Sequence, residues 1–462
     1  MYSQEFYNKL LSMALKNGGD YADVFVEDTN DTVLLFDSGK VKSINTGLIA
    51  GAGIRVIMGG KSVYLYASNA DEQKLLNLAE TVAQAVKYDK RGNLGDLTPV
   101  SLSNAHNIRI LPSSVDLRDK LEILSRADTA ARDHSSKIQE VIVRYWDNSQ
   151  NVTIATSEGR LVNDKRIRTR LAVTAVGVEG DKKETGFFGP GKALGFELFD
   201  RYTPESIAEE AARIALVSLE AGAAPQGKMP VVMDNAFGGV IFHEACGHAL
   251  EATAVADNAS VFCGKLGQQI ANPIVTAIDD GTLPNEWGSQ NFDDEGMPTQ
   301  KNVLIENGIL KSYMVDKLGS LKMNHPVTGS GRKESYKYAP TSRMTNTFIA
   351  PGNSTLEEMI STIDNGLYCR NMGGGSVNPP TTDFNFAVAE AYLIKNGKID
   401  RPVKGASLIG KGSDIIQNIE MVGRNLDYGT GMCGSESGSI PANVGQPPIK
   451  VTGLVVGGQE GL

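Results

Sequence analysis

Residues 243–248 place two imidazoles and a carboxylate within a short stretch, and they include two of the chain's five histidines. Imidazole is a common zinc ligand, and a glutamate beside the metal is the usual base for activating water. His243, Glu244 and His248 therefore favour a metal-dependent hydrolytic site. A short apolar run precedes them, and Asp234 or Asn235 is expected to cap the helix that carries them.

The spacing of the two histidines requires an irregular helix. His243 and His248 are five residues apart, which separates them by about 140° around a regular helix. Their imidazoles converge only if the turn widens to the π-type spacing, and Gly247 lowers the cost of that distortion. In the alternative interpretation, Glu244 and His248 form an i, i+4 pair and His243 is a satisfied core histidine. The spacing alone does not decide between these two interpretations.

A catalytic zinc site needs a third protein ligand and one open position. Cys246 lies between the histidines and Glu251 lies farther along the helix, so neither is a good candidate. Cys263 and Cys369 lack any flanking pattern and are expected to be buried as small apolar residues. Cys433 differs, because it lies in a glycine-rich loop whose backbone can approach another element closely.

Residues 243–252 resemble the His-Glu-x-x-x-His signature of the TldD/PmbA family of metallopeptidases. Matches to the family are strong from about residue 228 to the end of the chain and diffuse before it. The further matching segments are Asp279-Asp280-Gly281-Thr282, Asp293-Asp294-Glu295-Gly296, Arg343-Met344-Thr345-Asn346-Thr347, Cys433-Gly434 and Val455-Val456-Gly457-Gly458. Because the signature is present, the chain resembles the TldD-like catalytic branch rather than the branch that lacks it.

The resemblance implies one Zn²⁺ per chain, held by His243, His248 and Cys433, with Glu244 as the catalytic base. It implies a zinc-dependent peptidase that hydrolyses short or unfolded peptides inside a chamber enclosed by a dimer. The implied dimer is a homodimer or a heterodimer with a non-catalytic relative. After Cys433-Gly434 the family commonly has Lys and a Gly-Gln pair, whereas this chain has Ser435-Glu436-Ser437-Gly438-Ser439. That departure bears on substrate preference rather than on metal binding.

Two other functions fit the same residues. A zinc hydrolase of a non-peptide amide would keep the metal, whereas a peptide-binding or scaffold protein would bury the histidines as structural groups. A peptidase also needs a donor for the developing oxyanion. Arg332, Tyr336, Tyr338 and Arg343 are the candidates, although solvated arginines and packing tyrosines are the expected interpretation of each.

Two acidic clusters invite a second metal, namely residues 279–280 and 293–295. Neither cluster has the ligand spacing of a calcium loop. We expect them to be turn caps and a solvated acidic loop.

Composition excludes several classes of protein. A net charge of -9 argues against a dedicated nucleic-acid binder. The four cysteines show no disulfide framework, and no apolar run is long enough to span a membrane. The start of the chain lacks the features of a signal peptide, so we expect a cytoplasmic protein.

The chain's 462 residues predict two domains of α+β class. Residues 1–225 are expected to form an N-terminal α/β domain of antiparallel sheet with flanking helices, and residues 226–462 a mostly β, barrel-like domain that carries the site helix. A possible internal duplication begins near residue 110. Helices are predicted at 2–17, 71–86, 116–133 and 204–220, and short strands at 21–27, 32–36, 41–44, 54–58, 62–66, 141–145, 152–156, 167–178, 384–389 and 451–456. Residues 220–228 are predicted to be a linker, and the Asn-Gly pairs at 307–308 and 396–397 to be hairpin turns.

Overall fold

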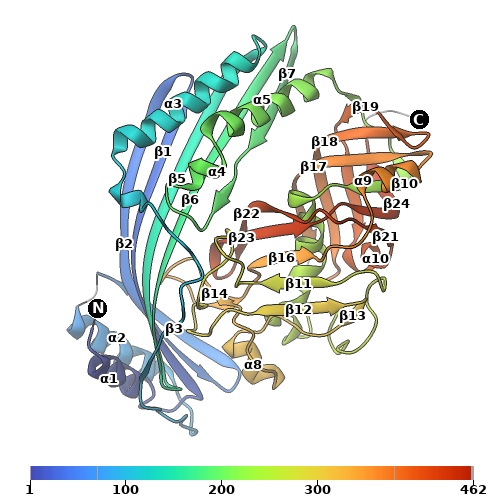
Figure 1. The fold of residues 1–462 in the computed structure, drawn as a ribbon. Helices are drawn as coiled ribbons and strands as arrows, with labels where there is room; N and C mark the ends of the chain where they lie inside the picture. The colour runs from blue at the N-terminus through green and yellow to red at the C-terminus, as the bar shows by residue number, and fades with distance from the viewer. Residues whose placement is uncertain (1, 70, 379, 459–462) are drawn as a thin grey trace.

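The computed structural model describes residues 2–69, 71–378 and 380–458. The chain is α+β, as expected, and long antiparallel strands of its N-terminal half curve beside a C-terminal half of shorter strands (Figure 1). Among the described residues, no helix is long and apolar enough to cross a membrane.

The N-terminal sheet has the strand order β3-β2-β1-β5-β6-β4, with β7 and β8 also paired to β6. Its strands are β1 (Tyr21–Asp37), β2 (Lys40–Met58), β3 (Lys61–Ser68), β4 (Thr98–Val100), β5 (Ile138–Thr156), β6 (Arg160–Glu179), β7 (Lys182–Phe188) and β8 (Gly191–Lys192). The predicted runs 21–27 and 32–36 are one strand, and 141–145 and 152–156 are another. Polar residues separate the predicted runs. The strands nevertheless continue through these residues, because the neighbouring strands supply partners for their backbone hydrogen bonds.

Helices cover the opposite ends of this sheet. The helices α1 (Gln4–Ala14) and α2 (Glu72–Ala85) pack on one end, and α3 (Leu117–His134) and α5 (Pro204–Glu220) pack on the other. A four-residue helix, α4 (Leu198–Arg201), precedes α5. The order helix, three antiparallel strands, helix therefore occurs twice, and the two units join where β1 pairs with β5.

The C-terminal half contains a closed ring of five strands, which confirms the barrel-like prediction. The ring runs β17-β10-β24-β20-β18 and closes by the pairing of β18 with β17. The strands of this sheet are β9 (Gly222–Ala223), β10 (Gly227–Met233), β17 (Asn365–Asn378), β18 (Asp383–Lys395), β19 (Lys398–Lys404), β20 (Ser407–Lys411), β21 (Ile419–Val422) and β24 (Ile449–Gly457). The predicted linker is partly a strand, since β9 pairs with β19.

A second C-terminal sheet has the order β13-β12-β11-β16-β23-β22. Its strands are β11 (Ala277–Asp280), β12 (Lys301–Glu306), β13 (Ile309–Leu310), β16 (Asn346–Ile349), β22 (Asp427–Ser435) and β23 (Gly438–Gln446). The short strands β14 (Gly331–Arg332) and β15 (Thr341–Ser342) pair separately. This half also contains the helices α8 (Lys317–Met323), α9 (Leu356–Ser361) and α10 (Gly412–Ile415), and the short helices α6 (Val240–Phe242) and α7 (Ala252–Val255) of the histidine segment. Both predicted Asn-Gly turns join hairpins, with positive φ at Asn307 (49°), Gly308 (81°), Asn396 (48°) and Gly397 (69°).

Candidate metal centre

The segment that carries the histidines leaves the ring at the end of β10 and turns at Ala236, whose φ is 54°. Short helical turns follow, comprising a 3₁₀ turn at Ala236–Gly239, α6 (Val240–Phe242), a π turn at His243–Gly247, a 3₁₀ turn at His248–Leu250 and α7 (Ala252–Val255). The expected side-chain cap is absent in the described structure. Asn235 makes no capping bond, and the Asp234 carboxylate accepts from Tyr368 Oη and from the Asn235 amide instead.

The helix is irregular in the way that the histidine spacing predicts. The π turn at His243–Gly247 brings the two imidazole rings to a centroid distance of 5.1 Å, at nearly a right angle. Gly247 has an ordinary helical φ of -55°. A Cβ at that position would lie 2.3 Å from Met344 Sδ, so the glycine is required for close packing rather than for an unusual conformation.

Close backbone packing also brings this segment to the second sheet. A Cβ on Gly239 would lie 2.5 Å from the backbone of Gly445 on β23, so the first turn can rest on the strand only with glycine there. The neighbouring strand β22 carries Cys433 opposite Ile440 of β23. The site therefore joins two elements that lie about 190 residues apart in the chain.

Buried side chains hold β22 in place from both directions. Trp287 Nε1 donates to the Gly431 carbonyl at 2.8 Å. Arg343, which is fully buried, donates to the carbonyl of Cys433 and, through Nη1, to the Gly438 carbonyl at 3.0 Å. Its guanidinium thus ties the residue that carries the thiol to the turn of its own hairpin.

The three expected metal-binding side chains lie together. Cys433 Sγ is 3.3 Å from His243 Nε2 and 3.5 Å from His248 Nε2, and one candidate ligand atom from each residue lies within 4.8 Å of the others. Tetrahedral zinc bonds to nitrogen and sulfur place neighbouring ligand atoms about 3.3–3.6 Å apart. The nitrogen–sulfur separations match that range, so this donor set fits a zinc ion.

The negative charges of Cys433 and Glu251 also favour a bound metal cation. Burial by itself raises the pKa of Cys433, but His243 and His248 outweigh it and the pKa lies well below its usual range. Burial by itself lowers the pKa of His248, but Glu251 and Cys433 outweigh it and raise that pKa well above its usual range. A thiolate is the form of cysteine that binds metal.

Two glutamates occupy different positions around His248. Glu251 is buried, and its Oε2 lies 2.9 Å from His248 Nδ1, which fixes the ring and leaves Nε2 turned toward Cys433. Glu244 is more exposed, at 27% of its side chain, and its Oε2 lies 3.7 Å from His248 Nε2. The i, i+4 contact of the alternative interpretation therefore exists. His243 is not a satisfied core histidine, however, because its buried Nδ1 has no hydrogen-bond partner in the described structure.

The other cysteines point away from the cluster. Cys246 Sγ lies 3.6 Å from the Gly412 carbonyl, and both Cys246 and Cys369 are buried in the main C-terminal core. Burial raises the pKa of each of these two thiols. Cys263 is partly buried against the same core. The prediction that Cys263 and Cys369 pack as small apolar groups is confirmed, and Cys246 packs in the same way.

The arginines named as candidate oxyanion donors are buried, so the expectation that they are solvated is wrong. Arg332 donates to the carbonyls of Met344 and Pro441, at 2.5 and 2.8 Å, and Arg343 holds the Cys433 hairpin. Burial of each guanidinium is compensated by its hydrogen bonds to main-chain carbonyls, which are satisfied in turn. Tyr336 is buried and packs with Phe25 and Phe292, as expected of a packing tyrosine, and Tyr338 is half-buried.

The two acidic clusters are not solvated, which corrects that part of the prediction. All five carboxylates are buried. The expected capping role is present, since Asp280 accepts from the amide and hydroxyl of Thr282 and Asp293 accepts from three backbone amides. Asp279 instead accepts from Thr345 and Thr347 of a segment distant in the sequence. Asp294 and Glu295 instead bind arginines of the N-terminal sheet, which a reading of the local sequence alone could not show.

Comparisons with known proteins match most of the chain to one family. Family models match as PmbA/TldA metallopeptidase domain 1 at residues 22–88, the central domain at 110–219 and the C-terminal domain at 226–458. A Haemophilus influenzae protein named "Metalloprotease TldD homolog" is 38% identical, over 95% of this chain and 93% of its own. A Saccharolobus solfataricus relative, named "Zinc metalloprotease TldD homolog", is 26% identical over 97% of this chain and 99% of its own.

Solved structures share the fold. A Thermotoga maritima protein described as a candidate modulator of a DNA gyrase superposes with a TM-score of 0.79 at 21% identity, covering 98% of this chain and 100% of that one. TldE from Thermococcus kodakarensis superposes with a TM-score of 0.77 at 19% identity, covering 98% and 99%. The three matching family models and the 38% identical relative show that this chain belongs to the TldD/PmbA family of metallopeptidases.

Proposed function

We propose that the protein is a zinc-dependent peptidase that hydrolyses short or unfolded peptides, with His243, His248 and Cys433 as the metal ligands. The observation that carries the proposal is the meeting of the three donor atoms, with nitrogen–sulfur separations that suit zinc, beside the partly exposed carboxylate of Glu244. The zinc named in the relative from Saccharolobus solfataricus is consistent with it.

Zinc bound to these residues would supply a Lewis acid that polarises the scissile carbonyl and lowers the pKa of water. Glu244 is the residue of this chain that would take a proton from the attacking water and return it to the leaving amine. Its exposure allows contact with a substrate, whereas Glu251 is buried behind His248 and orients it. Two carboxylates beside one histidine thus have separate roles.

The substrate proposal rests on the place of Cys433 in its sheet. β22 is the last strand in the order of that sheet, so a peptide extended alongside it would run past Cys433. Extended peptides bind sheet edges through main-chain hydrogen bonds, which place little demand on side-chain sequence. This favours unfolded peptides over folded proteins.

We also propose a cytoplasmic protein of two domains, residues 1–225 and 226–462, that acts as a homodimer or as a heterodimer with a non-catalytic relative. Separate apolar cores in the two halves support the division. The likeness of the fold to TldE supports a partner of the same family.

The proposed function is tested by incubating the full-length, zinc-loaded protein with a short unstructured peptide and following cleavage by mass spectrometry. We expect cleavage that a chelator abolishes and added zinc restores. A protein that binds zinc but cleaves only small non-peptide amides would replace the proposal with the second hydrolase. A protein that binds the peptide, takes up no zinc and cleaves nothing would be a scaffold.

A Glu251→Gln variant is expected to bind zinc about 10- to 100-fold more weakly than the wild type, because His248 loses its charged orienting partner. Zinc affinity measured by competition with a chromophoric chelator checks this. The exposed Glu357 supplies a matched control, and Glu357→Gln should leave the affinity unchanged. An unchanged affinity in Glu251→Gln would contradict the orienting role.

A further inference from the structure

A cavity of about 480 Å³ lies between the N-terminal sheet and the β22–β23 hairpin. Its walls come from strands β1, β5 and β6 on one side and from Met432, Ile440 and Pro441 of the hairpin on the other. Ile440 packs against Cys433 in a small apolar cluster. The cavity is therefore linked to the proposed metal ligand Cys433 through Ile440, which lies in its lining.

The sheet presents a polar face to this cavity. Gln150, Asn148 and Trp146 of β5 lie opposite Arg166, Arg168 and Arg170 of β6, respectively, and all six line the cavity. Alternate residues of a strand point to the same face, so the three arginines form a row along β6. The sequence shows this as Arg-x-Arg-x-Arg at residues 166–170, a pattern that overlaps the predicted strand at 167–178.

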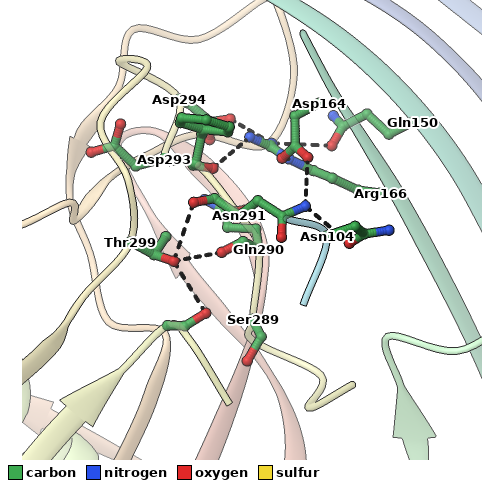
Figure 2. A network of polar contacts seen from close by, with 12 residues as sticks. Asn104, Gln150, Asp164, Arg166, Ser289, Gln290, Asn291, Asp293, Asp294 and Thr299 are labelled. Atoms are coloured by element: carbon green, nitrogen blue, oxygen red, sulfur yellow. Dashed lines mark hydrogen bonds and ion pairs between the residues drawn. The ribbon is translucent and has the colours of Figure 1, made fainter. Parts of the chain in front are cut away.

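Only the first arginine of this row has carboxylate partners. Arg166 lies between Asp164 and Asp294, at 3.0 and 2.6 Å, which fixes the loop of residues 289–294 on the sheet (Figure 2). Arg168 is buried and donates to the carbonyls of Trp287 and Ser289, at 2.9 and 3.0 Å. Arg170 is half-buried and donates to the Gly189 carbonyl at 3.0 Å. Among the described residues, neither Arg168 nor Arg170 has a carboxylate within 4.0 Å.

Donors without acceptors line the same cavity. Arg332 is 2% exposed and its Nε has no partner among the described residues, and the buried Nε2 of Gln290 has none either. Arg144 of β5 is exposed and also lines the cavity. The cavity thus holds more hydrogen-bond donors and positive charge than its own acceptors neutralise.

The acidic residues of the lining are already engaged. Glu27 accepts from Thr29 Oγ1, Gln150 Nε2 and the Tyr336 amide at 2.6–2.9 Å. Asp31 accepts from Asn148 at 2.6 Å. Burial, together with the neighbouring Arg332 and Arg166, lowers the pKa of Arg168 to about 9.

We propose that this cavity is a subsite for a carboxylate of the bound peptide, either its C-terminal carboxylate or an Asp or Glu side chain. The inference rests on the proposed peptidase function and names the class of peptide preferred at the same site. Planar guanidinium groups recognise carboxylates through paired hydrogen bonds. A cavity of this size admits a side chain or a chain end, and Ile440 of its lining packs against Cys433.

The test measures binding, so that turnover is not required. The full-length, zinc-loaded Glu244→Gln protein is titrated with four fluorescent, unstructured peptides of otherwise identical sequence. One has a free C-terminus, one is amidated, one is amidated with an internal Glu, and one is amidated with Gln in its place. We expect at least about tenfold tighter binding of a peptide that carries the recognised carboxylate, because a charged hydrogen bond is lost without it. The first pair identifies a C-terminal source and the second pair a side-chain source.

Variants then locate the effect. Arg170→Gln and Arg144→Gln in the same background should remove the preference for the carboxylate peptide and leave affinity for the neutral peptide unchanged. Arg170→Lys should restore part of the preference. The exposed Arg118 on α3 lies outside the cavity lining, and Arg118→Gln is the matched control. Circular dichroism confirms that each variant is folded, and Arg144 is exposed enough that its replacement spares the core.

Equal binding of all four peptides, no binding of any, or an unchanged preference in both arginine variants would overturn the proposal. Cleavage by wild-type protein separates the two levels of the argument. Peptides cleaved at equal rates with and without the carboxylate would retain the peptidase and remove the subsite. A carboxylate-dependent complex that wild-type protein never cleaves would retain the subsite and remove the peptidase.

Discussion

Replacement of Glu244 by Gln is expected to lower peptide hydrolysis by about 100- to 10,000-fold while zinc remains bound, because general-base catalysis contributes a factor of this size. Gln keeps the shape and polarity of the side chain but cannot take a proton. Glu244 lies 3.7 Å from His248 and is not one of the three grouped donors, so the metal ligands are untouched. Initial rates on a short unstructured peptide, with zinc content measured on the same samples, check the prediction.

The control for this experiment is Glu357→Gln, which removes an exposed carboxylate on α9. Its rate and its zinc content should equal those of the wild type. A Glu244→Gln protein that is fully loaded with zinc and still active would contradict the assignment of the base. A variant that loses zinc would instead place Glu244 among the ligands.

Replacement of Arg55 by Met is expected to lower the free energy of unfolding by about 3–5 kcal/mol near neutral pH, because it removes the cation that pairs with the buried Asp23 and that donates to the buried Glu295 carboxyl. Arg55 lies 2.5 Å from Asp23 and 2.7 Å from Glu295, and all three side chains are 1% exposed. Asp23 is on β1 and Glu295 is in the C-terminal half, so the arginine joins the two halves. Denaturant unfolding of the full-length chain measures the loss.

The sign of the pH dependence follows from Glu295. Burial raises the pKa of Glu295 to about 8 even beside Arg55. A carboxyl whose folded pKa is raised binds its proton more tightly than in the unfolded chain, so its contribution to stability falls as pH rises. Without Arg55 that pKa rises further. Below about pH 8 Glu295 is protonated in both folded proteins and adds no pH dependence to the penalty of the variant, so the penalty should grow as the pH rises above about 8.

An exposed ion pair supplies the matched control for the Arg55 variant. Arg126 and Glu205 are 45% and 38% exposed, so Arg126→Met should cost about 1 kcal/mol or less. Equal losses in the two variants, or a penalty in Arg55→Met that shrinks with rising pH, would contradict the account of the buried junction.

The sequence predicted the local features of the site and missed its distant contacts. The five-residue spacing of His243 and His248 indicated a π turn, since only that geometry lets both rings converge, and the turn is present. Both Asn-Gly turns were also predicted correctly, because a turn with two successive positive φ angles accepts few types of residue. The proximity of Cys433 was implied by family resemblance and not by any local pattern.

The missed features depend on long-range packing. The sequence indicates only that Glu251 is a poor metal ligand. Its i, i+3 spacing from His248 is the one local signal that could have predicted its contact with the imidazole. Arg332 and Arg343 were expected in solvent because nothing local marks the main-chain carbonyls that they satisfy. The acidic loop of residues 293–295 was likewise expected to be solvated, since its partners Arg55 and Arg166 lie in the other half of the chain.

The central claim is tested most directly by the zinc content of gently purified protein, measured by elemental mass spectrometry for the wild type beside Cys433→Ala. The three grouped donors predict about one zinc ion per chain in the wild type and a lost or much weakened site in the variant. Absence of zinc from the wild type even after zinc is supplied, or full occupancy in the variant, would contradict the assignment of His243, His248 and Cys433 as the metal centre.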